Sequence, residues 1–171
     1  ADLPSWAGLP SLSLPGYAVL GTGAYPDVSG VGSNWYEGPV RVDNLFARAQ
    51  EAGLPSAVVA MGSWDTLYGP WATIVYTASW SATGHDYRAM AGTTEAIGQE
   101  AQRLLRETDV RLLYVHFGET DEAGHGYGGD SPEYLEAAFL IDAQIAALAG
   151  TLDWSRDLLV LTADHGMSGN L

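Results

Sequence analysis

The stretch VRLLYVHFGETDEAGHGYG, residues 110–128, joins an apolar run to a cluster of acidic, histidine and glycine residues. The run VRLLYVHF is typical of a strand buried in a parallel sheet, and the cluster after it places Asp121 and His125 four positions apart. A second apolar run, DLLVLTA, comes directly before Asp164 and His165. In open α/β sheets, ligands bind beyond the carboxyl ends of the strands. We therefore expect both acid–histidine pairs at one edge of a parallel sheet.

Helices and strands are predicted to alternate along the rest of the chain, which indicates an α/β fold with a mostly parallel sheet flanked by helices. The helix of residues 131–150 has the clearest signals, because Ser131 is a favoured N-cap and Pro132 suits the first helical position. A second helix is expected to begin at the N-cap Asp43 and to end at Gly53. The remaining expected elements are helices at 13–21 and 93–108, strands at 56–62, 73–78, 110–117 and 157–163, and loops at 23–41 and 77–92.

The composition indicates a globular, acidic chain. Its 171 residues suit one domain, and no apolar run reaches the roughly 18 residues of a membrane-spanning helix. The 21 acidic residues outnumber seven arginines, and the net charge of −14 excludes nucleic-acid binding through a basic face. This excess of acid is either a solvated surface or is partly offset by bound cations. Because cysteine is absent, any metal ion must be held by oxygen and imidazole ligands.

The two acid–histidine pairs have the ligand types that hold Zn²⁺ or Mn²⁺ when thiolates are absent. Gly124, Gly126 and Gly166 stand beside them and are expected to let the backbone turn tightly there. The alternative for each pair alone is a turn cap and a surface histidine. The occurrence of two such pairs, each after an expected strand, favours a metal site. His116 lies inside its strand and is expected to be a packed core histidine, whereas His85 is expected to be a loop residue.

Ser13 stands at the start of the first expected helix, in the segment SLSLPGYAVLG. One interpretation is an ordinary N-cap, since serine is favoured at that position. The other is a nucleophile at the positive end of a helix, where a phosphate group can also bind. Ser11 is the competing candidate nucleophile. Asn34, in the glycine-rich segment that follows, is a neutral donor that we consider as a partner of a phosphoryl oxygen.

Three segments together resemble the alkaline phosphatase superfamily, and most closely its type I phosphodiesterase/nucleotide pyrophosphatase group. They are PSLSLPGYAVLGTGAYPDVSGVGSNWY, then DEAGHGYG with SPEYLEAAFLIDAQIAAL, and finally LLVLTADHG, in the same order as in that group. The resemblance implies a three-layer, alkaline phosphatase-like catalytic domain. It also implies hydrolysis of small-molecule phosphate esters with a serine nucleophile and two divalent metal ions, for which Zn²⁺ is expected in preference to Mn²⁺.

Residue by residue, the resemblance makes Ser13 the nucleophile and Asn34 a partner of a phosphoryl oxygen. The metal ligands that it implies are Ser13, Asp121, His125, Asp164 and His165. One ion would be held by Asp164, His165 and the nucleophile, and the other by Asp121 and His125. Two ions about 4 Å apart would clamp an in-line displacement at phosphorus.

The sequence departs from the family pattern at several points. The family takes a further aspartate from a strand well upstream of the nucleophile, and Asp2 is too near Ser13 to fill that place. It also takes a histidine from beyond the Asp-His-Gly motif. We therefore expect residues 1–171 to be part of a longer catalytic domain. Ser29-Gly30 stands where many members have His-Gly. Without a cysteine or a sulfatase signature, the sulfatase branch is excluded.

Two other functions are kept beside hydrolysis: a phosphotransferase or mutase on the same fold, and a non-catalytic module that binds a ligand or partner. Aromatic side chains could line a pocket, although core packing explains most of them; the candidates are Tyr17, Trp35, Tyr36, Trp64, Trp71 and Trp80. The absence of cysteine and the resemblance lean towards an extracytoplasmic setting. The oligomeric state stays open.

Overall fold

The computed structural model describes the backbone of residues 11–78 and 87–169 and the side chains of residues 11–77 and 93–169. Its centre is a parallel sheet that, within these residues, has the strand order β2-β1-β3. The strands are β1 (Ser56–Met61), β2 (Ile74–Ala78) and β3 (Leu112–His116). Ala60 of β1 stands opposite His116 of β3, so the carboxyl ends of these two strands lie side by side. The predicted α/β fold with a parallel sheet is confirmed.

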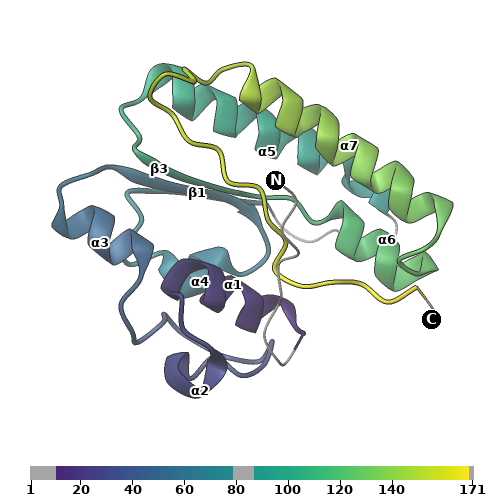
Figure 1. Ribbon diagram of the computed structural model, residues 1–171, viewed down its shortest axis with the longest axis horizontal. Helices are drawn as coiled ribbons and strands as arrows, with labels where there is room; N and C mark the ends of the chain where they lie inside the picture. The colour runs from purple at the N-terminus through teal and green to yellow at the C-terminus, as the bar shows by residue number, and fades with distance from the viewer. Residues whose placement is uncertain (1–10, 79–86, 170–171) are drawn as a thin grey trace.

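Helices cover both faces of the sheet and make the three layers seen in Figure 1. On one side lie α5 (Tyr87–Glu107) and, packed against it, α7 (Pro132–Ala149). On the other side lie α1 (Ser13–Thr22), α3 (Leu45–Glu51) and α4 (Trp64–Tyr68). Alternate residues of β1 point to opposite faces, so Val58 packs in the core beside α1 and α4, whereas Val59 packs beside α5.

Capping residues begin and end the helices largely as predicted, but the predicted N-cap of α3 is wrong. Ser131 accepts a hydrogen bond from the backbone of Tyr134 and begins α7, as predicted. The N-cap of α3 is Asn44 and not Asp43, because the Asn44 side chain accepts the hydrogen bond of the Ala47 N–H. Gly53 follows this helix with a φ of 67°, a left-handed conformation that favours glycine and ends the helix as predicted.

Short helices occupy three places where none was predicted. They are α2 (Pro26–Ser29), α4 and α6 (Glu119–Tyr127), and α5 also begins inside the predicted loop, at Tyr87. In α6, Gly124 and Gly126 lie within the helix, so they do not make the tight turns expected from their composition. Packing overrides the weak helix propensity of glycine here, because Ala123 is fully buried and α6 packs on α7.

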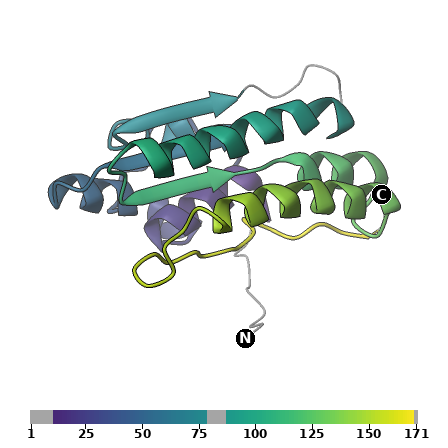
Figure 2. The ribbon, with the colours of Figure 1, turned by 90° about the horizontal axis from the view of Figure 1, so that it is seen from above.

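The predicted strand at residues 157–163 is wrong. The segment is extended but pairs with no described strand, and Figure 2 draws it as plain chain towards the C-terminus. Leu158 is 85% exposed and Val160 is 72% exposed, although the run is as apolar as β1. An apolar run becomes a strand only when its backbone pairs with a neighbouring strand. Among the described residues β3 pairs only with β1 and keeps a free edge, and residues 157–163 do not pair with that edge.

Three residues named in the sequence analysis lie outside the described residues: Asp2, Trp80 and His85. Within the part of the chain that the structure covers, no helix combines the length and the apolar character needed to cross a bilayer.

Candidate active site

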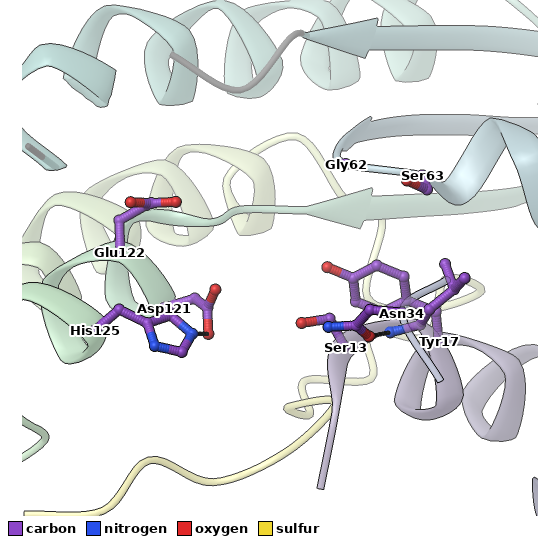
Figure 3. Close-up of a pocket in the computed structure, with 9 residues that line it drawn as sticks. Ser13, Tyr17, Asn34, Gly62, Ser63, Asp121, Glu122 and His125 are labelled. Atoms are coloured by element: carbon purple, nitrogen blue, oxygen red, sulfur yellow. Dashed lines mark hydrogen bonds and ion pairs between the residues drawn. The ribbon is translucent and has the colours of Figure 1, made fainter. Parts of the chain in front are cut away.

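A pocket lies at the carboxyl edge of the sheet, where the sequence predicted a site. It encloses about 690 Å³ of empty space, part of it open to solvent. Gly62 and Ser63 line it from the end of β1, and α6, which follows β3, contributes another wall. Figure 3 shows the beginning of α1 facing α6 across the pocket. The lining residues are Ser13, Leu14, Tyr17, Asn34, Gly62, Ser63, Asp121, Glu122 and His125.

Ser13 lines this pocket and does not cap its helix. The N-cap is Leu12, with extended dihedral angles, so Ser13 is the first helical residue. The capping acceptor comes from elsewhere in the chain, because Asn34 Oδ1 accepts the Leu14 N–H at 2.9 Å. The interpretation of Ser13 as an N-cap is therefore wrong. Its side chain lines the pocket and does not cap the helix. Ser11, the competing candidate, precedes the helix and is exposed.

The bond to Leu14 also orients the Asn34 amide. Because Oδ1 is used by the backbone N–H, the amide presents Nδ2 to the pocket on the side of Ser13 (Figure 3). An NH₂ group of an amide only donates hydrogen bonds. The nucleophile candidate therefore has a neutral donor beside it.

The C-terminal segment reaches Ser13 because α1 offers it a glycine. A Cβ at Gly16 would lie 2.5 Å from the backbone oxygen of Asp164, so only glycine permits this close approach. His165 Nε2 then lies 3.2 Å from Ser13 Oγ, a hydrogen-bonding distance between residues 152 positions apart. The second acid–histidine pair thus reaches the site although the run before it forms no strand.

The two acid–histidine pairs meet through Asp121. Its Oδ1 lies 3.4 Å from His125 Nε2, one turn further along α6, and 3.7 Å from His165 Nε2. Asp164 Oδ2 lies 3.4 Å from the same nitrogen of His165. The structure therefore brings together all four side chains that the sequence grouped, with His165 near the carboxylates of both Asp121 and Asp164.

Burial gives the carboxyl group of Asp164 an unfavourable environment for negative charge. Desolvation raises the pKa of Asp164, and the charge of Asp121 adds to that rise. Asp121 Oδ1 is buried and accepts no hydrogen bond, although two imidazole nitrogens lie near it. A cation bound here would relieve both conditions.

The donor set of two carboxylates and two imidazoles fits Zn²⁺ or Mn²⁺ chemically. Their arrangement is different from a finished metal site, because the side chains contact one another directly. Among the described residues, no three histidine, aspartate or glutamate side chains converge on one point that could hold an ion. The chemistry of the residues fits a metal, and their geometry is that of a cluster of direct contacts.

His116 is the packed core histidine that its place in a strand predicted. Its Nδ1 lies 2.9 Å from the carbonyl oxygen of Met61, and its ring packs against Tyr17 and Trp64. Burial lowers the pKa of His116 from 6.5 to about 4, so the ring is neutral at pH 7.

Five lining residues were not predicted as site residues: Leu14, Tyr17, Gly62, Ser63 and Glu122. Tyr17 was among the aromatic residues considered for a pocket, and Ser63 follows a predicted strand end, which was a usable signal. Glu122 stands between the two residues of the first acid–histidine pair. Of the other aromatic candidates, Trp64 is fully buried in the core as expected, whereas Trp35 is 89% exposed and neither lines the pocket nor belongs to the core.

Comparison with known proteins gives a family match over nearly the whole chain. The family model described as type I phosphodiesterase / nucleotide pyrophosphatase matches residues 6–170. Curated relatives include proteins named GPI ethanolamine phosphate transferase 1 from Gibberella zeae (30% identical), Aspergillus oryzae (31%) and Mus musculus (25%). Each alignment covers 94% of this chain but only 18%, 17% and 19% of the relative, respectively. The chain thus spans less than a fifth of the length of these relatives.

Proposed function

The chain belongs to the type I phosphodiesterase/nucleotide pyrophosphatase family, and from that premise we propose that it transfers a substituted phosphoryl group from a phosphodiester to an alcohol acceptor through Ser13. The family membership confirms the resemblance of the three sequence segments. The relatives are named as transferases, so they favour transfer over the hydrolysis that the resemblance first implied. Hydrolysis is the same reaction with water as acceptor.

The contact between Ser13 and His165 is the observation that carries this proposal. A serine hydroxyl at the first position of α1 lies 3.2 Å from an imidazole nitrogen that belongs to a second acid–histidine pair. The macrodipole gives the N-terminus of a helix a partial positive charge, which favours negative charge nearby. A phosphoryl group in the pocket would therefore meet a nucleophile and a positive helix end on one side.

The reaction has two balanced halves. In the first, Ser13 Oγ forms a bond to phosphorus, the bond from phosphorus to the leaving oxygen breaks, and the serine proton passes to the leaving alcohol. In the second, the acceptor oxygen bonds to phosphorus, the bond to Ser13 Oγ breaks, and the acceptor proton returns to the serine. His165 Nε2 holds the hydroxyl in place, and Asn34 Nδ2 donates to a phosphoryl oxygen.

Divalent ions, when bound, would stabilise negative charge on Ser13 Oγ and on the phosphoryl oxygens. We propose Asp164, His165 and Ser13 as ligands of one ion and Asp121 and His125 as ligands of the other, with Zn²⁺ preferred over Mn²⁺. The buried, unbonded Oδ1 of Asp121 supports this proposal, as does the raised pKa of Asp164.

The names of the relatives suggest ethanolamine phosphate as the transferred group. A test uses the 4-nitrophenyl ester of ethanolamine phosphate, with glycerol as acceptor and Zn²⁺ added. We expect release of 4-nitrophenol and a glycerol ester of ethanolamine phosphate, detected by mass spectrometry. Ser13→Ala should abolish both products, whereas the matched control Ser11→Ala should keep them. Equal turnover by Ser13→Ala and the wild type would refute the proposal, and free ethanolamine phosphate as sole product would favour hydrolysis.

A further inference from the structure

Tyr17 lies one helical turn after Ser13 on α1, and its phenol lines the same pocket. Side chains four positions apart on a helix share one face. Figure 3 shows the phenol oxygen of Tyr17 and the hydroxyl of Ser13 directed to the same side, towards α6. In the sequence analysis, Tyr17 is only one of several aromatic side chains that could line a pocket.

The ring of Tyr17 is packed against two neighbouring rings. It is stacked on Trp64 with 4.4 Å between the ring centroids, and it meets His116 edge-on at 4.8 Å. The residue is only 3% exposed, and the hydroxyl of Tyr68 donates a 2.8 Å hydrogen bond to its backbone carbonyl. A ring fixed in this way holds its hydroxyl at one place without further loss of conformational entropy.

The hydroxyl of Tyr17 lies within hydrogen-bonding reach of the Ser13 side chain. Both residues line the pocket. A neutral phenol interacts favourably with negative charge only by donating its hydrogen bond.

We propose that the Tyr17 hydroxyl is a catalytic hydrogen-bond donor to Ser13 Oγ, stabilising this oxygen as it attacks phosphorus and again as it leaves. The inference rests on the proposed function, since it assigns a second partner to the nucleophile of that reaction. In the first half the donor stabilises the negative charge that Oγ carries after losing its proton. In the second half it stabilises the same charge as the bond from Oγ to phosphorus breaks.

The packing of the ring alone would not require the hydroxyl. The contacts with Trp64 and His116 are made by the ring carbons, and phenylalanine would make them equally. A single substitution therefore distinguishes ring packing from hydrogen-bond donation. Tyr17→Phe keeps the stacked ring and removes only the donor.

The test compares wild type, Tyr17→Phe, Ser13→Ala and the matched control Tyr114→Phe. Tyr114 belongs to the same aromatic cluster, with its ring 4.1 Å from that of Trp64, but it does not line the pocket. We expect Tyr17→Phe to lower kcat by about 100-fold, as is typical when one donor to a reacting oxygen is lost, with KM changed by less than about threefold. Tyr114→Phe should keep wild-type turnover.

A second readout separates a donor to Ser13 from a structural effect. Because the donor acts on Ser13 Oγ, the deficit of Tyr17→Phe should be similar for a 4-nitrophenyl ester and for a phenyl ester, whose leaving groups differ in basicity. The melting temperature should stay at the wild-type value.

Wild-type kcat in Tyr17→Phe, with Ser13→Ala inactive, would overturn this inference and leave the proposed function standing. A loss of activity that appears in KM, or that accompanies a lowered melting temperature, would also overturn it. Turnover that survives in Ser13→Ala would overturn the proposed function, and the role of Tyr17 with it.

Discussion

Replacing Asn34 by aspartate should stabilise the protein and at the same time inactivate it. The amide of Asn34 has two ends with separate tasks: Oδ1 accepts the Leu14 N–H at the start of α1, and Nδ2 points into the pocket. Aspartate keeps an acceptor for Leu14 and adds a negative charge at the helix N-terminus, which contributes about 0.3–1 kcal/mol of stability. It replaces the donor by an oxygen that repels a phosphoryl group.

The expected magnitudes distinguish the two tasks. Loss of one hydrogen-bond donor to a reacting oxygen typically lowers kcat by about 100- to 1,000-fold, so Asn34→Asp should lose that much turnover. Asn34→Ala removes both ends, and it should lose similar turnover and also about 1 kcal/mol of stability with the cap. For a chain of this length, that loss lowers the melting temperature by about 2–4 °C.

Asn44→Ala is a matched control for the cap. Asn44 Oδ1 accepts the Ala47 N–H at the start of α3, with the same 2.9 Å distance, but this residue does not line the pocket. It should lose about 1 kcal/mol of stability and keep its turnover. Thermal melts followed by circular dichroism, together with release of 4-nitrophenol, measure both quantities. Full turnover in Asn34→Asp would show that Nδ2 is not used, and an unchanged melt in Asn34→Ala would refute the cap.

Three further predictions follow from close packing and from burial of ionisable groups. Gly16→Ala places a Cβ 2.5 Å from the backbone oxygen of Asp164 and should displace His165 from Ser13, so turnover should fall sharply. Gly32→Ala, with open space around its Cβ, should not change turnover. Burial lowers the pKa of His116 from 6.5 to about 4, so the unfolded state binds more protons between these values. The free energy of unfolding of the metal-free protein, measured by urea titration, should therefore decrease by up to ~3 kcal/mol as the pH falls through this window. His116→Leu should make this decrease smaller. Burial raises the pKa of Glu119 from 4.5 to about 7, so charging it costs stability as the pH rises; Glu119→Gln should be more stable than wild type above pH 7 and equal to it below pH 4.5.

Local signals in the sequence were sufficient for much of the fold. The apolar runs predicted β1, β2 and β3, and Ser131 with Pro132 predicted the start of α7. These signals work because capping and strand burial depend on residues within a few positions of one another. The start of α3 was missed by one residue, since Asp43 and Asn44 are both good caps and only the backbone geometry chooses between them.

Two elements were mistaken because their state depends on distant neighbours. The glycines near His125 favoured a turn, yet α7 packs on this segment and makes it helix α6. The run at residues 157–163 has the composition of a strand but does not pair with the described sheet, although β3 lies at its edge. Hydrogen bonds of a sheet join separate segments, so composition alone does not decide whether an apolar run becomes a strand.

The sequence by itself determined the chemistry of the site: a hydroxyl at a helix start, two acid–histidine pairs and no thiol. Tertiary structure alone decided how they meet. It placed His165 against Ser13 across 152 positions, made Asn34 the cap of a helix that lies 20 positions before it, and directed the Tyr17 phenol to the same side as the Ser13 hydroxyl. The physical reason is that residue type sets what a group can donate, accept or bind, whereas a distance of a few ångströms between remote residues is set by the packing of whole elements.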